Sequence, residues 1–451
     1  MKWNFIYIFL IVGFVNERFV QSFRIGNTIF TLNEKKSNIE KINGFYGLVG
    51  PNIDVSKTNT LYELFTGDGI IQGVFLENGE INEISHIVQT EKIKYERKNG
   101  KFLNNMMFLP MYMFLNKMGM IPNVMGLANT AFLQVESRHF VLFERDLPYE
   151  ISLDFQEKKV KTLKKVNIDS IEHFSAHSTM DTENRIFSLE YNVLQKIVSL
   201  LHMNQDFGLV KKIDVHTKYI PIIHDSYILS NSTVFTDSPL EFSFQHLIKG
   251  KIPVVFDNTK PTFIHEICRK TGLKTTYQSK SSFYIFHYAE MRETDETIEI
   301  LASLYDKMDF SALDINGKYR RLILDKENKT VKIERNQKLE KYNLDFPIKW
   351  RDCIILRNIE NMRVNGFVIC KGLDIQKTIF LENLSICGEP QVYDDGTFSR
   401  IICLGYDGEM RGYLILIDPE DGQVFEFPLN MKTNIGFHSV FIKKSHFTVT
   451  Y

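Results

Sequence analysis

Tight-turn dipeptides recur from one end of this chain to the other, and they constrain its fold more than any other feature. Asparagine-glycine and aspartate-glycine pairs supply the positive φ angles that two-residue hairpin turns require. Short apolar or alternating runs such as YILSNSTVF, SSFYIFHY, RLILD and GYLILID lie between them. This pattern predicts consecutive antiparallel hairpins and therefore an all-β chain. The pairs are Asn43-Gly44, Asn78-Gly79, Asn99-Gly100, Asn316-Gly317, Asn365-Gly366, Asp395-Gly396, Asp407-Gly408 and Asp421-Gly422.

Convincing helical stretches are few. The two best run from Tyr191 to Met203 and from Thr297 to Met308, and we expect a helix at each. Because hairpin units continue through most of the 451 residues, a β-propeller is the most economical architecture, with its blades pointing toward one axis. The competing possibility is a second domain that is a β-sandwich.

Four histidines lie in hydrophobic stretches that are far apart in the sequence. They are His177 in FSAHSTMD, His224 in PIIHDSYIL, His287 in SFYIFHYAE and His438 in IGFHSVF. A histidine in an apolar strand needs partners for its ring nitrogens, and one metal ion at a common centre would serve all four. No single helix or loop could hold them together. Only a closed tertiary fold could do so.

Charge and cysteine content exclude several classes of protein. The chain has 54 basic and 55 acidic residues, and it shows no basic stripe, so we expect no nucleic-acid partner. The five cysteines form no C-x-x-C pair, which argues against a zinc ribbon or a disulfide framework and favours buried thiols. We find no strand-to-helix G-x-G-x-x-G motif that would bind a dinucleotide.

Two hydrophobic segments depart from the β pattern. Residues 1–22 carry an apolar run and resemble a secretory signal peptide, with an apolar first strand or N-terminal anchor as the alternative. The run from Met106 to Leu115 is too short to span a bilayer and is broken by Pro110. It suits peripheral membrane contact, although a flap buried under the core fits it equally well. Residues 23–451 are predicted to form a single domain.

Three acidic residues also stand in apolar settings. They are Glu144 in FVLFERDLPYE, Asp345 in LDFPIKW and Glu389 in ICGEPQVY. A metal-binding histidine usually donates its second ring nitrogen to a carboxylate, which fixes the tautomer of the ring. A buried acid without a partner is energetically costly, so these three positions call for nearby donors such as the histidines.

In this order and context, the histidines and acids resemble those of the carotenoid cleavage oxygenase family. The resemblance runs from about Asn43 to the end of the chain. NGFYGLVGPN and ELFTGDGIIQGVFLENGEI are similar to the family's opening glycine-proline and aspartate-glycine segments. ANTAFLQVESRHFVLFERDLPYEI matches the region of the first orienting glutamate, and FSAHSTMD, IIHDSYILSNSTVFTDSPLEF, YIFHYAE and GFHSVF match the four histidine motifs.

The resemblance implies a seven-bladed β-propeller with an axial metal site and a few short helices capping one face. By analogy Glu144, Asp345 and Glu389 orient His224, His287 and His438, respectively. The sequence departs from the family where Asp345 replaces a glutamate, and we expect this shorter side chain to reach His287 only through water or a backbone shift. Ser178 and Ser439 also replace the usual proline and glycine after their histidines, which leaves ligation intact. The implied Fe(2+) ligands are His177, His224, His287 and His438.

The activity implied by the resemblance is that of a non-haem Fe(II) dioxygenase. It would cleave a conjugated carbon-carbon double bond of a carotenoid, apocarotenoid or related lipophilic polyene with O2, giving two carbonyl products. Phe and Tyr side chains would line the substrate tunnel. The alternatives are a retinoid isomerohydrolase on the same scaffold and a non-catalytic carotenoid-binding or lipid-binding relative. We expect a membrane-associated protein, in the secretory pathway if the N-terminal signal is real and otherwise in the cytoplasm.

Overall fold

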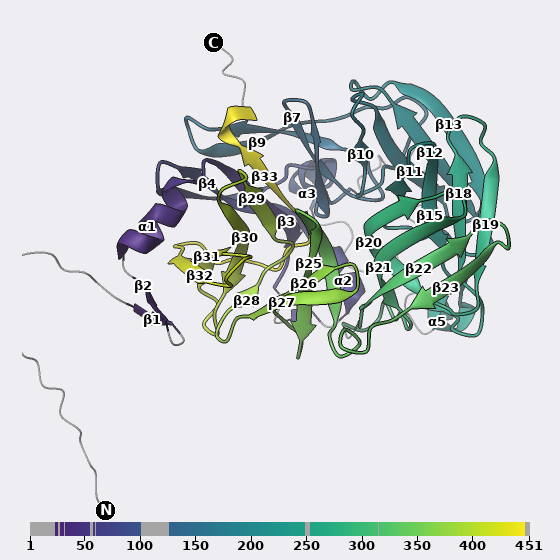
Figure 1. The fold of residues 1–451 in the computed structure, drawn as a ribbon. Helices are drawn as coiled ribbons and strands as arrows, with labels where there is room; N and C mark the ends of the chain where they lie inside the picture. Colours follow the sequence, from purple (N-terminus) through teal and green to yellow (C-terminus); the bar gives the residue numbers. More distant parts are fainter. Residues whose placement is uncertain are drawn as a thin grey trace, which may run out of the picture.

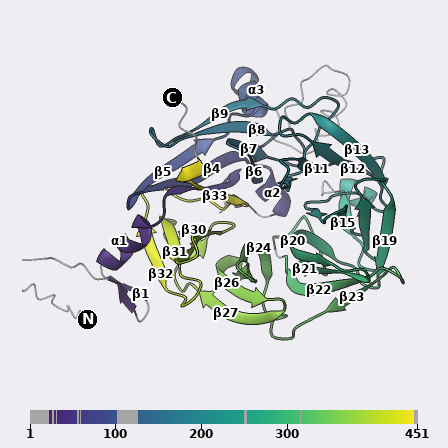
Figure 2. The same cartoon turned by 45° about the horizontal axis from the view of Figure 1, so that its top comes forward.

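The strands of this protein form seven groups that surround a central axis (Figures 1 and 2). The computed structural model describes residues 23–446 apart from 26–27, 31, 55–56, 59, 101–125, 249–252 and 314. We call the groups blades 1 to 7. The predicted all-β, propeller-like fold is confirmed, whereas residues 1–22 and the run from Met106 to Leu115 lie outside the described residues.

Each blade is an antiparallel group of four strands, except that blade 7 has five. Blade 1 consists of β33 (Ser439–Lys443), β3 (Gly44–Asn52), β4 (Asp68–Glu77) and β5 (Glu80–Ile87). Blade 2 consists of β6 (Ala131–Val135), β7 (Arg138–Leu142), β8 (Tyr149–Asp154) and β9 (Lys159–Lys165). Blade 3 consists of β10 (Thr179–Met180), β11 (Ile186–Asn192), β12 (Ile197–Met203) and β13 (Leu209–His216). Blade 4 consists of β14 (Tyr227–Ile228), β15 (Ser232–Asp237), β18 (Phe263–Cys268) and β19 (Lys274–Ser279). Blade 5 consists of β20 (Tyr284–Glu293), β21 (Thr297–Tyr305), β22 (Lys318–Asp325) and β23 (Thr330–Glu334). Blade 6 consists of β24 (Leu344–Trp350), β25 (Cys353–Glu360), β26 (Arg363–Lys371) and β27 (Asp374–Phe380). Blade 7 consists of β28 (Ser385–Ile386), β29 (Gln391–Asp394), β30 (Ser399–Tyr406), β31 (Gly412–Ile417) and β32 (Val424–Pro428).

Two features tie the ring together. In blade 1, the late strand β33 pairs with the early strand β3 over five residue pairs from Gly44↔Lys443 to Leu48↔Ser439, and Figure 1 shows the yellow strand beside the purple ones. Blades 4 and 5 are joined at the rim, where β19 and β23 pair in parallel (Figure 2). Closing the ring with strands from both ends of the described chain makes the inner ends of all blades converge on one axis.

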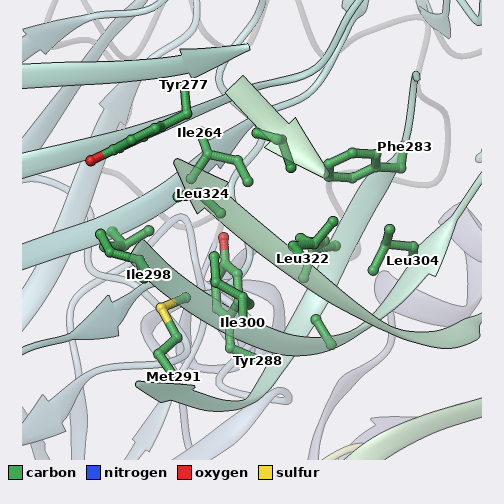
Figure 3. Packing of buried hydrophobic residues seen from close by; sticks show 14 of the residues in the cluster. Ile264, Tyr277, Phe283, Tyr288, Met291, Ile298, Ile300, Leu304, Leu322 and Leu324 are labelled. Atoms are coloured by element: carbon green, nitrogen blue, oxygen red, sulfur yellow. The ribbon is translucent and has the colours of Figure 1, made fainter. Parts of the chain in front are cut away.

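Hydrophobic side chains at every second strand position build the core between blades. In blade 5, Ile298 and Ile300 of β21 and Leu322 and Leu324 of β22 share a face and are fully buried. They pack against residues of blade 4 that include Ile264 of β18 (Figure 3). Successive side chains of a strand point to opposite faces, so this spacing of two gives the sheet an apolar face.

Half of the predicted turn dipeptides form hairpin turns. Asn78 and Gly79 join β4 to β5 with φ angles of 51° and 83°. The pairs at residues 395–396, 407–408 and 421–422 connect the consecutive strands of blade 7. Gly366 instead lies within β26, where an added Cβ would stand 2.1 Å from the carbonyl oxygen of Ile379. The dipeptides therefore marked the hairpins well but not exclusively.

Both predicted helices are wrong. Residues Thr297–Tyr305 of the second stretch form β21, because Ile298, Ile300, Ala302 and Leu304 are buried in one cluster at a spacing of two. Tyr191 to Met203 contains the end of β11 and all of β12, and Lys196 takes a φ of 54° in the turn between them. A positive φ at a residue with a side chain breaks a helix, so the turn separates two strands.

The helices of the described residues are short. They are α1 (Leu32–Glu40), α2 (Leu61–Phe65), α3 (Glu91–Asn99), α5 (Phe244–Ile248) and the 3-10 turn η3 (Lys444–His446). None of the helices in this part of the chain has the length and apolar character needed to cross a bilayer. The cysteines are all free thiols, and four of the five are buried, as predicted. β1 (Phe23–Ile25) pairs with β2 (Thr28–Phe30), and β16 (Leu240–Phe242) pairs with β17 (Val254–Phe256).

Candidate metal centre

The four predicted histidines meet at the axis. His177, His224 and His438 lie just before β10, β14 and β33, respectively, while His287 lies within β20. Each of these strands is the edge strand from which its blade begins in the pairing order. One ring nitrogen from each histidine lies within 4.8 Å of the other three. The structure therefore brings together residues from four different blades.

The spacing of these nitrogens suits a shared metal ion. Nε2 of His438 lies 2.9 Å from Nε2 of His177 and 3.3 Å from Nε2 of His287. Two nitrogens bound to one ion at right angles are roughly 3 Å apart, given metal-nitrogen bonds of about 2.1 Å. Opposite ligands would span roughly 4.2 Å. All four nitrogens lie within 4.8 Å of one another, which is close to this span, so the set could hold one ion.

Carboxylates contact the other ring nitrogen of three of the histidines. Nδ1 of His224 lies 2.6 Å from Oε1 of Glu144, and Nδ1 of His287 lies 3.0 Å from Oδ1 of Asp345. Nδ1 of His438 lies 3.3 Å from Oε1 of Glu389. The three predicted pairings are therefore present in the structure. A carboxylate at Nδ1 makes that atom the N–H donor and leaves the lone pair of Nε2 facing the centre.

The short side chain of Asp345 reaches His287 directly and not through water. The pairing of β24 with β25 shifts register between Asp345 and Ile348, and Phe346 has a φ of 56° at this bulge. Asp345 also accepts hydrogen bonds from the Tyr305 hydroxyl and, at 2.8 Å, from the backbone N–H of Phe346. These donors make Asp345 a firmly held acid. Its loss of one methylene is accommodated by the irregular strand that carries it.

His177 is held differently from the other three. Among the described residues no carboxylate contacts its ring, whose aromatic contacts are with His224, His287 and His438 at centroid distances of 4.3 to 5.0 Å. Ser178, which follows it, turns its hydroxyl away and donates a hydrogen bond to the carbonyl of Ser175. Packing against the other imidazoles therefore fixes this ring.

The electrostatics of the centre favour the neutral form of two imidazoles, those of His177 and His438. Burial, reinforced by the neighbouring rings, holds the pKa values of His177 and His438 well below the ordinary value. Burial also acts to lower the pKa of His224, but the hydrogen bond to Glu144 outweighs it and raises that pKa. Burial acts to raise the pKa of Asp345, yet His287, Tyr305 and the Phe346 N–H together lower it. A neutral imidazole offers a lone pair to a divalent cation, and the low pKa values of His177 and His438 keep these two rings neutral.

A large cavity reaches this centre. It has a volume of about 2600 Å³ and is lined by His224, His287 and His438 together with many apolar side chains. The prediction of an aromatic lining is consistent with this wall. Sequence reasoning missed three cavity residues beside the histidines, namely Tyr305, Phe346 and Arg357. The aromatic members of the wall include Phe65, Phe143, Tyr284, Phe286, Phe310, Phe346 and Phe437.

Known sequences resemble much of this chain. The family model described as retinal pigment epithelial membrane protein matches residues 40–355. Carotenoid 9,10(9',10')-cleavage dioxygenase 1 of Pisum sativum is 25% identical over 294 residues, which make up 61% of this chain and 53% of that protein. Isoeugenol monooxygenase of Pseudomonas putida is 22% identical over 299 residues, or 61% of this chain and 58% of that protein. The matches thus span little more than half the length of these relatives.

Solved structures share the fold over a longer stretch. Lignostilbene dioxygenase of Pseudomonas brassicacearum superposes with a TM-score of 0.74 at 16% identity, covering 90% of this chain and 93% of that one. Cobalt-substituted apocarotenoid oxygenase of Synechocystis gives a TM-score of 0.72 at 16% identity, with the same coverage. At this identity the superpositions establish a common fold for the described chain.

Proposed function

Because the chain belongs to the carotenoid oxygenase family, whose retinal pigment epithelial membrane protein model covers most of it, we propose that it is a non-haem Fe(II) dioxygenase. Its substrate would be a carotenoid, an apocarotenoid or a related lipophilic polyene. O2 would add across one carbon-carbon double bond, so that the bond breaks and each carbon leaves with one oxygen as a carbonyl group. No other oxidant or reductant is required for this balance.

The observation that carries the proposal is the meeting of the four histidines with an apolar cavity. Three of the four rings line a cavity of about 2600 Å³ whose wall is rich in aromatic side chains. Such a wall binds an extended hydrophobic molecule by burying its surface. A polyene held there would place its double bonds against the metal-binding face of the histidines.

The choice of iron rests on the donor set. Four neutral nitrogen ligands suit Fe(II), leave its charge uncancelled, and contribute four of the positions around the ion. Three of these four histidines also line the cavity, so a substrate there would lie beside the ion that they would hold. When bound there, ferrous iron would activate dioxygen for reaction with an electron-rich alkene.

The protein's own residues would orient the rings and exclude water. Glu144 and Asp345 accept the Nδ1 protons of His224 and His287, which keeps both Nε2 lone pairs aimed at the centre. Phe346 packs against the rings of His287 and His438, with centroids 4.6 Å and 5.0 Å away. This aromatic contact would shield the reacting bond from water on one side.

Labelled oxygen tests the proposed reaction. The iron-loaded protein is incubated with a panel of carotenoids, apocarotenals and stilbenes under 18O2, and the carbonyl products are analysed by mass spectrometry. We expect label in both products when exchange with water is suppressed. Products that carry no label, or no scission of any substrate by folded and iron-loaded protein, would contradict the proposal.

The two alternative functions give different results in the same assay. A retinoid isomerohydrolase would convert a retinyl ester equally well without oxygen, whereas scission would stop under anaerobic conditions. A non-catalytic binder would retain carotenoid without turnover and without metal.

We further propose that the run from Met106 to Leu115 takes substrate from a membrane surface, which vesicle co-sedimentation of a charge-substituted variant would test.

A further inference from the structure

A buried arginine stands beside the metal centre with its charge facing the cavity. Arg357 belongs to β25 and pairs across the ladder with Asp345 of β24. Side chains of directly opposed residues lie on the same face of a sheet, so both point toward the axis. Arg357 lines the cavity and is only 8% exposed.

The guanidinium of Arg357 is not paired directly with a carboxylate in the described part of the chain, and Asp345 and Glu389 act on it only through longer-range attraction. No hydrogen bond or ion pair there involves its side chain, and its buried Nε is without an acceptor. Its one recorded side-chain contact is the ring of Phe346, whose centroid lies 3.7 Å from the guanidinium carbon. The nearby acid Asp345 already binds His287, Tyr305 and the Phe346 N–H. The positive charge is therefore stacked on an aromatic ring and has no direct carboxylate contact.

Two other basic side chains of the cavity wall, Lys318 and Lys212, are satisfied by the protein. Lys318 donates to the carbonyl oxygens of Glu340 and Tyr342 at 2.6 Å and 2.8 Å. Lys212 forms an ion pair with Glu190 at 2.9 Å. Removing a charge from water without pairing it is costly, and burial lowers the pKa of Arg357 accordingly. A ligand that brings an anion would relieve this cost.

We propose that Arg357 binds a carboxylate group of the substrate, so that the preferred substrate is a conjugated acid rather than a neutral polyene. A planar guanidinium matches a carboxylate through two parallel hydrogen bonds. A dianion such as phosphate fits less well, because Glu144, Asp345 and Glu389 surround the same centre. This inference rests on the proposed function and names the substrate class of that site.

The position of Arg357 also restricts which double bond would react. The ring of Phe346 contacts both the guanidinium and the rings of His287 and His438. A carboxylate held by Arg357 would therefore lie only a few bonds from the carbon atoms next to the metal-binding nitrogens. The cleaved bond would be near the acid end of the conjugated chain.

The test compares an acid with its neutral ester in protein that need not turn over. Binding of retinoic acid and of methyl retinoate is measured by fluorescence quenching for the wild type, Arg357→Met and Arg357→Lys. We expect the wild type to prefer the acid, and Arg357→Met to lose about 10- to 100-fold in acid affinity while ester affinity stays within a few fold. Arg357→Lys keeps the charge without the planar fork and should keep part of the preference.

Equal binding of acid and ester by the wild type, or an acid preference that survives in Arg357→Met, would overturn the inference. If the methionine variant does not fold, Arg357→Lys decides alone, because an undiminished preference there would exclude a bidentate contact. Scission of neutral polyenes without acid preference would refute only the role of Arg357. Arg357-dependent acid binding by an iron-loaded protein that cleaves nothing would refute only the proposed oxygenase function.

Discussion

Two buried histidines of this protein show how its blades differ from its axis. His265 of blade 4 uses both ring nitrogens within the protein, with Nδ1 3.0 Å from Oγ1 of Thr276 and Nε2 3.2 Å from Oδ2 of Asp237. His287 at the axis uses Nδ1 in the same way, on Asp345, but its Nε2 faces the other imidazoles. Both histidines have an aspartate partner, and only the second nitrogen distinguishes them.

The buried arginines repeat this difference. Arg320 of β22 is 2% exposed, and it donates hydrogen bonds of 2.7 to 2.9 Å to the carboxylates of Asp306 and Glu340. Arg357 has comparable burial and no carboxylate partner among the described residues. Buried polar groups in proteins normally have hydrogen-bond partners, so a buried polar group without one marks a place where a ligand could supply the partner. Arg357 is such a group beside the four histidines.

Removing an axial histidine should have the largest effect on function. We expect His224→Ala to abolish metal binding and oxygenase activity while the β-rich fold persists, because one of four ligands is lost and Glu144 is left without its donor. Anaerobic titration with Fe(II) followed by metal analysis measures this. Iron retained at the wild-type stoichiometry would refute the assignment of His224. The matched control, His265→Ala, should lower stability and leave iron affinity unchanged.

Substituting the two arginines by methionine should separate stability from ligand binding. Arg320→Met leaves Asp306 and Glu340 without their cation, and we expect it to lower the free energy of unfolding by about 3–5 kcal/mol. Arg357→Met removes a charge that has no anionic partner, so its unfolding free energy should change by less than about 1 kcal/mol. Urea unfolding followed by circular dichroism checks both values. Equal losses for the two variants would erase the distinction between blade and axis.

A buried histidine of blade 2 should make the fold sensitive to acid. Burial lowers the pKa of His139 to about 4, below the ordinary value of 6.5. The contribution of neutral His139 to the stability of the fold is complete above pH 6.5 and is lost as pH falls toward 4. In this range the unfolded chain binds a proton at His139 and the folded chain does not. This difference amounts to at most about 3 kcal/mol. Unfolding free energies measured from pH 7 to pH 4 should fall less steeply in His139→Gln, and identical slopes would exclude His139 as a source.

Weakening an orienting acid should reduce metal affinity without abolishing it. Asp345→Asn keeps the size of the side chain but removes the negative charge that His287 contacts. We expect iron affinity to fall by about 10- to 100-fold, the usual cost of losing such a partner. Competition with a metal-binding dye measures the affinity. Unchanged affinity would mean that packing alone orients His287, as it does His177.

The sequence and its family resemblance predicted which histidines and acids would meet, but not that Arg357 and Phe346 would lie beside them. The four histidines and three acids stand in apolar runs where each polar side chain needs a partner, and that need is visible in the sequence. Arg357 and Phe346 gave no such signal, because their place beside the metal centre depends on the cross-strand register of β24 with β25 and on the bulge after Asp345. The strand at Thr297 to Tyr305 was predicted to be a helix because the spacing of its apolar residues was assigned the helical period and not the period of two of a strand. Register and bulges arise from tertiary packing.

The stoichiometry of iron in the folded protein tests the central claim most directly. Purified metal-free protein is reconstituted anaerobically with Fe(II), separated from free ion and analysed for iron and protein together. The account predicts one iron per chain, and it predicts near-zero iron for each of the alanine variants of His177, His224, His287 and His438. A folded wild-type protein that retains no iron, or one whose iron content is unaffected by all four substitutions, would contradict it.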